Sequence, residues 1–213
     1  ILKNKILVNQ NFFSIYNGYD KKEFDKVKST RPDYFNIVFT GVLSENNNYE
    51  IFLKAIKTLD PIKNNLNIKF NLAGNIEKDI IDSFSNFVKT KSAGYLSHNE
   101  AISFMKSSHL LVNFNYHGTN KPDMISGKLI EYLATGSPII NISHTNSESE
   151  SLISLSEDSV TASQHDLDKI VSYISKRYIN WFKGEFKEKI PNNIDEYSRL
   201  NLTKKLAIIL SEI

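Results

Sequence analysis

The sequence has 213 residues, 40% of them apolar and 23% charged, which is the balance of one globular domain built around an apolar core. The formal net charge of +2 is too small to indicate a nucleic-acid-binding protein, and the absence of cysteine excludes disulfides and thiolate chemistry. The chain opens with Ile1 and has no apolar run near the roughly 20 residues that span a bilayer. We therefore expect a soluble, cytoplasmic fragment of a longer protein.

Short β-rich runs alternate with amphipathic segments along most of the chain. The predicted strands are residues 36–40, 68–73, 89–93, 109–115, 138–142 and 159–162. The predicted helices among them are residues 49–59, about 76–87, 99–107 and 127–135. Glycine is expected to end the preceding element at four places: Gly41, Gly74, Gly94 and Gly136. Six β-α units of this kind predict an α/β fold with a doubly wound, mostly parallel, six-stranded Rossmann-like sheet.

The tail adds two predicted helices, over residues 166–182 and 195–211, with Pro191 between them. The first carries an apolar stripe, which we interpret as a core-packing face: Leu167, Ile170, Val171, Ile174, Tyr178 and Trp181. Its end is both basic and aromatic, with Lys183, Lys187 and Lys189 beside Trp181, Phe182 and Phe186. Contact with an anionic membrane surface and an ordinary amphipathic helix end explain this composition equally well.

Ligands of open parallel sheets bind beyond the carboxyl ends of the strands, where the strand order reverses. If the order is the common 3-2-1-4-5-6, the reversal lies between the first and fourth predicted strands. The loops that would meet there are residues 41–48 and 116–126, and both are rich in polar side chains. Surface loops are polar in any case, so this topology favours a ligand site only modestly.

The segment that follows the second loop carries residue types suited to a phosphorylated ligand. A helix beginning near Ser126 would direct unpaired backbone N–H groups at the crevice, and Gly127 would let a phosphate approach closely. Lys128 adds a point charge, and Glu131, one turn further on, is an acceptor suited to a ribose diol. A surface helix with a solvated Lys and Glu fits the same pattern, so helix mechanics leaves both readings open.

Residues 126–140 resemble the P-x-K-x-x-E-Y-L-A-x-G-x-P-I segment of glycosyltransferases of the GT-B fold, especially those of the family 4 (group 1) type. Four further landmarks occur in the order of that family. Residues 15–20 resemble the I-x-N-G-x-D segment that opens the donor domain, residues 39–41 and 72–74 its first two strands with their Gly turns, and residues 94–97 the G-Y-V-S segment before the helix that holds Glu100. The resemblance runs from about residue 12 to the end. It implies that residues 1–213 form a single donor-binding domain, one half of a GT-B fold with C-terminal helices, and that the N-terminal acceptor domain is absent from this chain.

The resemblance also implies roles for individual residues at the donor site. Glu131 would bind the ribose hydroxyls of the nucleotide, and Ser126, Gly127 and Lys128 would face its pyrophosphate. The turn at Gly41 would lie beside them. Two neighbours in the chain would border the base: Tyr95 and Leu96.

The loop before the helix would reach the donor sugar. Asp123 stands eight residues before Glu131, where many relatives have the first Glu of an E-x7-E pair, and it is shorter than Glu by one methylene. His117 and Gly118 lie where this loop could contact the sugar, although a structural histidine explains His117 equally well.

One departure from the family pattern concerns the pyrophosphate. Many relatives place an Arg and a Lys just after the first strand, whereas residues 42–48 here read Val-Leu-Ser-Glu-Asn-Asn-Asn. Neutralisation of the phosphates would then fall on Lys128, Lys121 and helix N-termini.

The reaction implied is transfer of a hexose from a UDP- or GDP-linked donor to a hydroxyl acceptor, with retention of configuration, in polysaccharide or glycoconjugate biosynthesis. We expect no metal and no other cofactor, because the resemblance is to GT-B enzymes, which generally transfer the sugar without a bound metal. The catalytic base is not identified, and the isolated domain is expected to turn over little or nothing. The partners expected are the nucleotide sugar, the missing acceptor domain and, in the full-length protein, the cytoplasmic face of a membrane, but no nucleic acid. Two alternatives stay open: a GT-B nucleotide-sugar epimerase, and a non-catalytic nucleotide-sugar-binding module or partner subunit.

Overall fold

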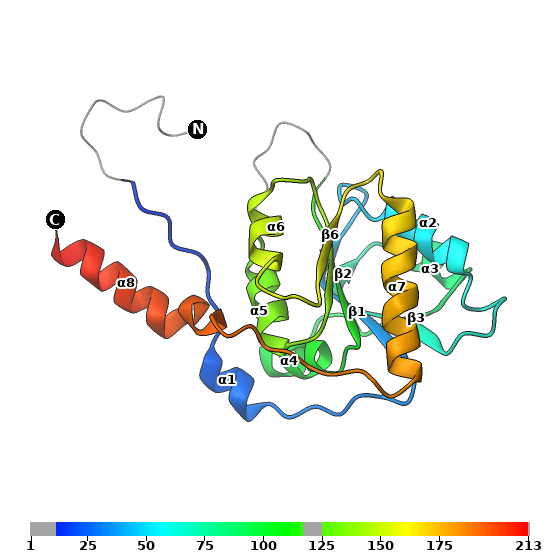
Figure 1. Cartoon of the computed structure of the whole chain (residues 1–213), viewed down its shortest axis with the longest axis horizontal. Helices are drawn as coiled ribbons and strands as arrows, with labels where there is room; N and C mark the ends of the chain where they lie inside the picture. The colour runs from blue at the N-terminus through cyan, green and yellow to red at the C-terminus, as the bar shows by residue number, and fades with distance from the viewer. Residues whose placement is uncertain (1–11, 117–124, 213) are drawn as a thin grey trace.

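A single six-stranded parallel sheet forms the centre of the molecule in the computed structural model, which describes residues 12–116 and 125–212 (Figure 1). The strand order is β3-β2-β1-β4-β5-β6, and every neighbouring pair is parallel. The strands are β1 (Phe35–Leu43), β2 (Ile68–Ile76), β3 (Lys89–Ser92), β4 (Leu110–Phe114), β5 (Ile139–Ile142) and β6 (Val160–Ala162). This order confirms the predicted Rossmann-like sheet. The order reverses between β1 and β4, which is where a ligand of such a sheet is expected to bind.

Helices cover both faces of the sheet (Figure 1). On one face α2 (Glu50–Leu59), α3 (Lys78–Ser85) and α7 (Leu167–Phe182) pack over the larger apolar cluster, into which β1 directs Phe35, Ile37 and Phe39. On the other face α4 (His98–Lys106), α5 (Gly127–Thr135) and α6 (Glu148–Ile153) pack over a second cluster that includes Val38 of β1. The alternation of side chains along β1 therefore supplies both cores.

The apolar stripe predicted on α7 is confirmed as a core-packing face. Ile170 and Ile174 are fully buried, and the other members of the stripe pack against the same cluster. At the end of this helix Trp181 packs near the buried His109, and Phe186 meets the same imidazole edge-on, whereas Phe182 is exposed. Packing thus accounts for two of the three aromatic residues there, and membrane contact stays a prediction. No described helix is both long and apolar enough to cross a bilayer.

The prediction that Gly41 and Gly74 end their strands is wrong. β1 and β2 run past them to Leu43 and Ile76, and the two glycines are direct partners in the parallel register. Their φ angles of 125° and 112° fall where only glycine is comfortable, so the ladder continues through a conformation that other residues would resist. Since Ile76 belongs to β2, the helix predicted to begin near it starts instead at Lys78.

Three short helical elements were missed by the sequence reading. These are α1 (Lys21–Lys26), the six-residue α6, and a 3-10 turn η1 (Ile194–Tyr197) that precedes α8 (Arg199–Ser211). One and a half turns are too few to display a helical period, and the predicted tail helix is divided because Ser198 adopts an extended conformation and caps α8 at Asn201.

An extended segment, residues 12–20, crosses the start of the tail, and we call it the N-terminal strap. Tyr19 and Ser198 form a parallel bridge, and the backbone N–H of Arg199 donates to the Tyr19 carbonyl at 2.9 Å. Gly18 is needed at this crossing, because a Cβ there would lie 2.4 Å from the Tyr197 carbonyl oxygen. The strap and the start of the tail are therefore joined to each other just before α8 (Figure 1).

Candidate donor site

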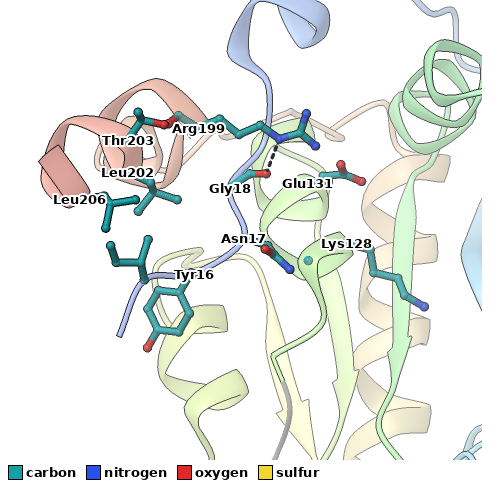
Figure 2. Close-up of a pocket in the computed structure, with 11 residues that line it drawn as sticks. Tyr16, Asn17, Gly18, Lys128, Glu131, Arg199, Leu202, Thr203 and Leu206 are labelled. Carbon is teal, nitrogen blue, oxygen red and sulfur yellow. Dashed lines mark hydrogen bonds between the residues drawn. The ribbon is translucent and has the colours of Figure 1, made fainter. Parts of the chain in front are cut away.

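A cavity of about 500 Å3 lies at the N-terminus of α5 (Figure 2). Its walls come from three segments that are remote in sequence, namely the strap, the first turns of α5 and the first turns of α8. The lining residues are Ile15, Tyr16, Asn17, Gly18, Gly127, Lys128, Glu131, Arg199, Leu202, Thr203 and Leu206. The positive ends of two helix dipoles, those of α5 and α8, therefore converge on one cavity.

A buried tyrosine fixes α5 against β1. The hydroxyl of Tyr132 accepts a hydrogen bond of 2.8 Å from the backbone N–H of Thr40, and the tyrosine is fully buried. Lys128 stands four residues earlier, on the same face of the helix, so it too is directed at β1. The helix ends, as predicted, at Gly136, which adopts a left-handed conformation.

Lys128 is a partly buried cation of the cavity wall, and its ammonium group lies against Phe39 and Gly41. Its Nζ atom lies 4.6 Å from the centre of the Phe39 ring, and burial lowers the pKa of its ammonium group to about 8. Within the described ranges it forms no ion pair and no hydrogen bond with another side chain. Burying an unpaired charge is costly, which makes this lysine available to an anionic ligand.

Gly41 makes room for this lysine. A Cβ added to Gly41 would lie 2.2 Å from the Lys128 Nζ atom, so any side chain there would displace the ammonium group. The glycine was expected to form the turn beside the pyrophosphate; in the structure it lies within β1 and receives the lysine.

Glu131 faces the cavity from the next turn of α5. Its side chain is 18% exposed, and its Oε1 atom lies 4.0 Å from the Nε2 atom of His98. The same His98 nitrogen is 3.0 Å from Glu23. Burial raises the pKa of the Glu131 carboxyl, the charges of His98 and Arg199 oppose that rise, and Glu23 adds to it.

Arg199 closes the cavity from the first turn of α8. Its Nε–H donates to the Gly18 carbonyl at 3.2 Å, and Figure 2 shows its side chain extending over the strap toward the part of the cavity that Glu131 occupies. Sequence reasoning missed both Arg199 and His98. The I-x-N-G-x-D landmark was the available signal for the strap, but nothing local to residue 199 ties it to residue 18.

The remaining predicted site residues do not all lie in the described cavity. Ser126 is the N-cap of α5, and its buried Oγ atom has no hydrogen-bond partner among the described residues. Tyr95 is 93% exposed, and Leu96 lines a separate pocket together with Glu100. Their contact with a base stays a prediction. Four residues of the sequence prediction lie outside the described residues: His117, Gly118, Lys121 and Asp123.

Carboxylates and histidines do not gather into a metal centre in the described part of the chain, where no three of them lie close enough to hold an ion. That the reaction proceeds without a metal stays a prediction.

Comparison with known families decides the class of protein. A family model described as glycosyl transferase-like matches residues 52–178, which is more than half of the chain. The chain belongs to this glycosyltransferase family. No curated protein has a sequence that matches it significantly.

Solved glycosyltransferases share the fold of this family member at low sequence identity. HepE of Anabaena, solved with UDP-glucose, has 15% identity and a TM-score of 0.67, over 93% of this chain and 57% of HepE. TarM of S. aureus, solved with UDP, has 16% identity and a TM-score of 0.64, over 97% of this chain and 40% of TarM. The catalytic domain of a Helicobacter pylori cholesterol-α-glucosyltransferase has 20% identity and a TM-score of 0.52, over 80% of this chain and 98% of that domain.

These similarities confirm the predicted fold, one half of a GT-B glycosyltransferase. The chain spans only about half the length of HepE and less of TarM. Membership of family 4 in particular stays a prediction.

Proposed function

We propose that the cavity at α5 binds a nucleoside diphosphate sugar, and that this domain supplies the donor site of an enzyme that transfers the sugar to a hydroxyl acceptor. The observation that carries the proposal is Lys128, a partly buried and unpaired cation at a helix N-terminus, one turn from the Glu131 carboxylate. A diphosphate needs the first of these groups and a ribose diol the second.

In this proposal two groups of the α5 N-terminal half have separate roles. Lys128 and the first N–H groups of the helix hold the diphosphate, and Glu131 accepts hydrogen bonds from the ribose hydroxyls. During transfer the bond between the sugar C1 and the β-phosphate oxygen breaks, and the diphosphate departs with the electron pair. A bond from C1 to the acceptor oxygen forms, and the acceptor hydroxyl gives up its proton to a base or to the departing diphosphate. Charge therefore grows on the phosphate oxygens, where a preorganised cation and helix dipole stabilise the transition state most.

The donor is proposed to be UDP-linked or GDP-linked. UDP was bound to HepE and to the pneumococcal O-GlcNAc transferase GtfA when their structures were solved, which favours a uridine nucleotide here. The acceptor, the catalytic base and the stereochemical outcome depend on groups outside the cavity described above.

Calorimetric titration with UDP, GDP, ADP and dTDP tests the proposal. We expect one nucleotide to bind saturably, and Lys128→Met and Glu131→Ala each to weaken it by about tenfold or more, since each removes a charged partner worth on the order of 1.5–3 kcal/mol. Lys78→Met is the matched control, because Lys78 is an exposed lysine in the first turn of α3. The proposal fails if none of the four nucleotides binds at millimolar concentration, either to this chain or to the longer protein.

A further inference from the structure

Arg199 stands on the wall of the cavity formed by α8, in reach of the same space as Glu131 on the wall formed by α5 (Figure 2). Its Nε–H is occupied by the Gly18 carbonyl, and its backbone N–H by the Tyr19 carbonyl at 2.9 Å. The first bond holds the guanidinium group against the strap, and the second holds the backbone of Arg199 there. Its NH1 and NH2 groups have no hydrogen-bond or ion-pair partner among the described residues.

The other cations of the site are committed elsewhere. Lys128 extends away from Arg199, and its ammonium group lies against Gly41 and Phe39 (Figure 2). His98 is 3.0 Å from Glu23 and only at the limit of an ion pair with Glu131. Arg199 is therefore the cation with free donors beside Glu131 in the described structure.

A carboxylate and a guanidinium group together match the hydrogen-bonding needs of a diol. An ionised carboxylate can only accept hydrogen bonds, and a guanidinium group can only donate them. Each hydroxyl of a diol both donates and accepts. A carboxylate alone would leave the lone pairs of the two hydroxyl oxygens to solvent, and a fixed guanidinium group beside it would satisfy them as well.

We propose that Arg199 completes the ribose subsite, with its NH1 and NH2 groups donating to the same ribose hydroxyl oxygens whose protons Glu131 accepts. The pair then selects ribonucleotides against 2′-deoxyribonucleotides, and the C-terminal helix contributes a specificity-determining residue to the donor site. This inference rests on the proposed function. The charge of Arg199 also opposes the rise in the pKa of Glu131 that burial causes, and so favours the ionised, accepting form of the carboxyl group.

The test compares the affinities of UDP and 2′-deoxy-UDP by calorimetry, in the wild-type chain and in variants. The wild type is expected to prefer UDP by about tenfold or more, because the deoxynucleotide leaves a donor and an acceptor of the site unpaired. In Arg199→Gln the ratio of affinities is expected to fall by about threefold or more, through weaker binding of UDP, because only the contact of the 2′-hydroxyl with Glu131 then remains. Lys205→Gln, which removes an exposed charge from the same helix, should leave the ratio unchanged.

Arg199→Lys separates charge from geometry, because lysine keeps the charge and lacks the planar fork. It too is expected to lower the preference for UDP by about threefold or more. Circular dichroism and thermal melts of each variant establish that it is folded. Equal weakening of both nucleotides in Arg199→Gln, or an unchanged ratio, overturns the inference while the proposed function stands. Failure of the folded wild type to bind either nucleotide overturns the proposed function, and the inference with it.

Discussion

Lys128 lies in the first turn of α5, and the pKa of its ammonium group is lowered to about 8. In the free protein this group loses its proton as the pH rises through 8, well below the ordinary value for lysine of about 10.4. A bound diphosphate favours the charged form and raises the pKa again. Binding above pH 8 should therefore be linked to uptake of a proton by this side chain.

We expect the affinity for the nucleoside diphosphate to fall by about twofold between pH 7 and 8 and by up to about tenfold per pH unit above 8. Calorimetry at pH 9 in two buffers of different ionisation enthalpy measures the linkage, and about one proton should be taken up per nucleotide. The phosphate groups themselves are fully ionised there, since their second pKa is near 6. Lys128→Met should bind more weakly and show no uptake. A wild-type protein whose binding enthalpy is the same in both buffers would contradict this role for Lys128.

Glu131 and Lys128 could be predicted from the sequence because one local motif contains both, and because a single helix fixes their relative positions. The partnership of Arg199 with Glu131 could not be. It depends on the contact between the strap and the start of α8. That contact is possible because Gly18 has no side chain. In the sequence, nothing distinguishes Gly18 from the other seven glycines as the one that permits this contact. Residues brought together by a long-range crossing leave no periodic signal.

Gly41 and Gly74 bring the ends of β1 and β2 into unusually close contact. A Cβ at Gly74 would lie 2.1 Å from the Gly41 carbonyl oxygen, and Gly74 has a φ of 112°. We expect Gly74→Ala to lower the free energy of unfolding by roughly 2–4 kcal/mol, because backbone strain and a steric clash with main-chain atoms add together. Urea denaturation measures the change.

Gly184→Ala is the matched control for this pair. Gly184 also has a positive φ, 72°, but a Cβ there would meet no atom within 4 Å. Its substitution should cost only the conformational strain, on the order of 1–2 kcal/mol. Equal losses at the two positions would show that the close approach of β1 and β2 contributes nothing measurable to stability.

Strands and helices differed in how well they could be predicted from the sequence. Apolar runs marked the central strands β1, β4 and β5, which are buried on both faces, and the longer helices showed their period in stripes such as that of α7. The edge strand β3 is polar and mostly exposed, so its signal in the sequence was weaker. Gly41 and Gly74 were misread because glycine usually interrupts a strand. Here the parallel pairing of β1 and β2 continues past both glycines. α6 was missed because its serine-rich sequence, ESESLI, buries Ser149 along with Leu152 and Ile153 and so has no apolar stripe.

At the scale of the whole molecule, the chain corresponds to about half of HepE and to less than half of TarM. A donor site on one domain binds one substrate only. We expect this chain to bind nucleotide and to give sugar transfer at or near background, and the longer protein to restore turnover, because the acceptor and any group that activates it must be held in register with the donor.

Release of free nucleotide from a panel of UDP- and GDP-sugars, with and without hydroxyl acceptors, compares the two proteins. Glu131→Ala in the longer protein is the control that ties its turnover to the cavity described here. Acceptor-dependent turnover by this chain alone would contradict the expectation and would mean that the described residues suffice for transfer.

The cavity takes one wall from residues 15–18 and another from residues 199–206. Within this domain, the ribosome synthesises the residues of the first wall before any strand of the sheet and those of the second wall only after all six strands. The central strands can pair while the cavity is still open on one side. The order of synthesis therefore postpones ligand binding until translation of this domain is nearly complete. A product that stops before α8, or that loses it to a protease, retains every strand of the sheet and lacks one side of the site.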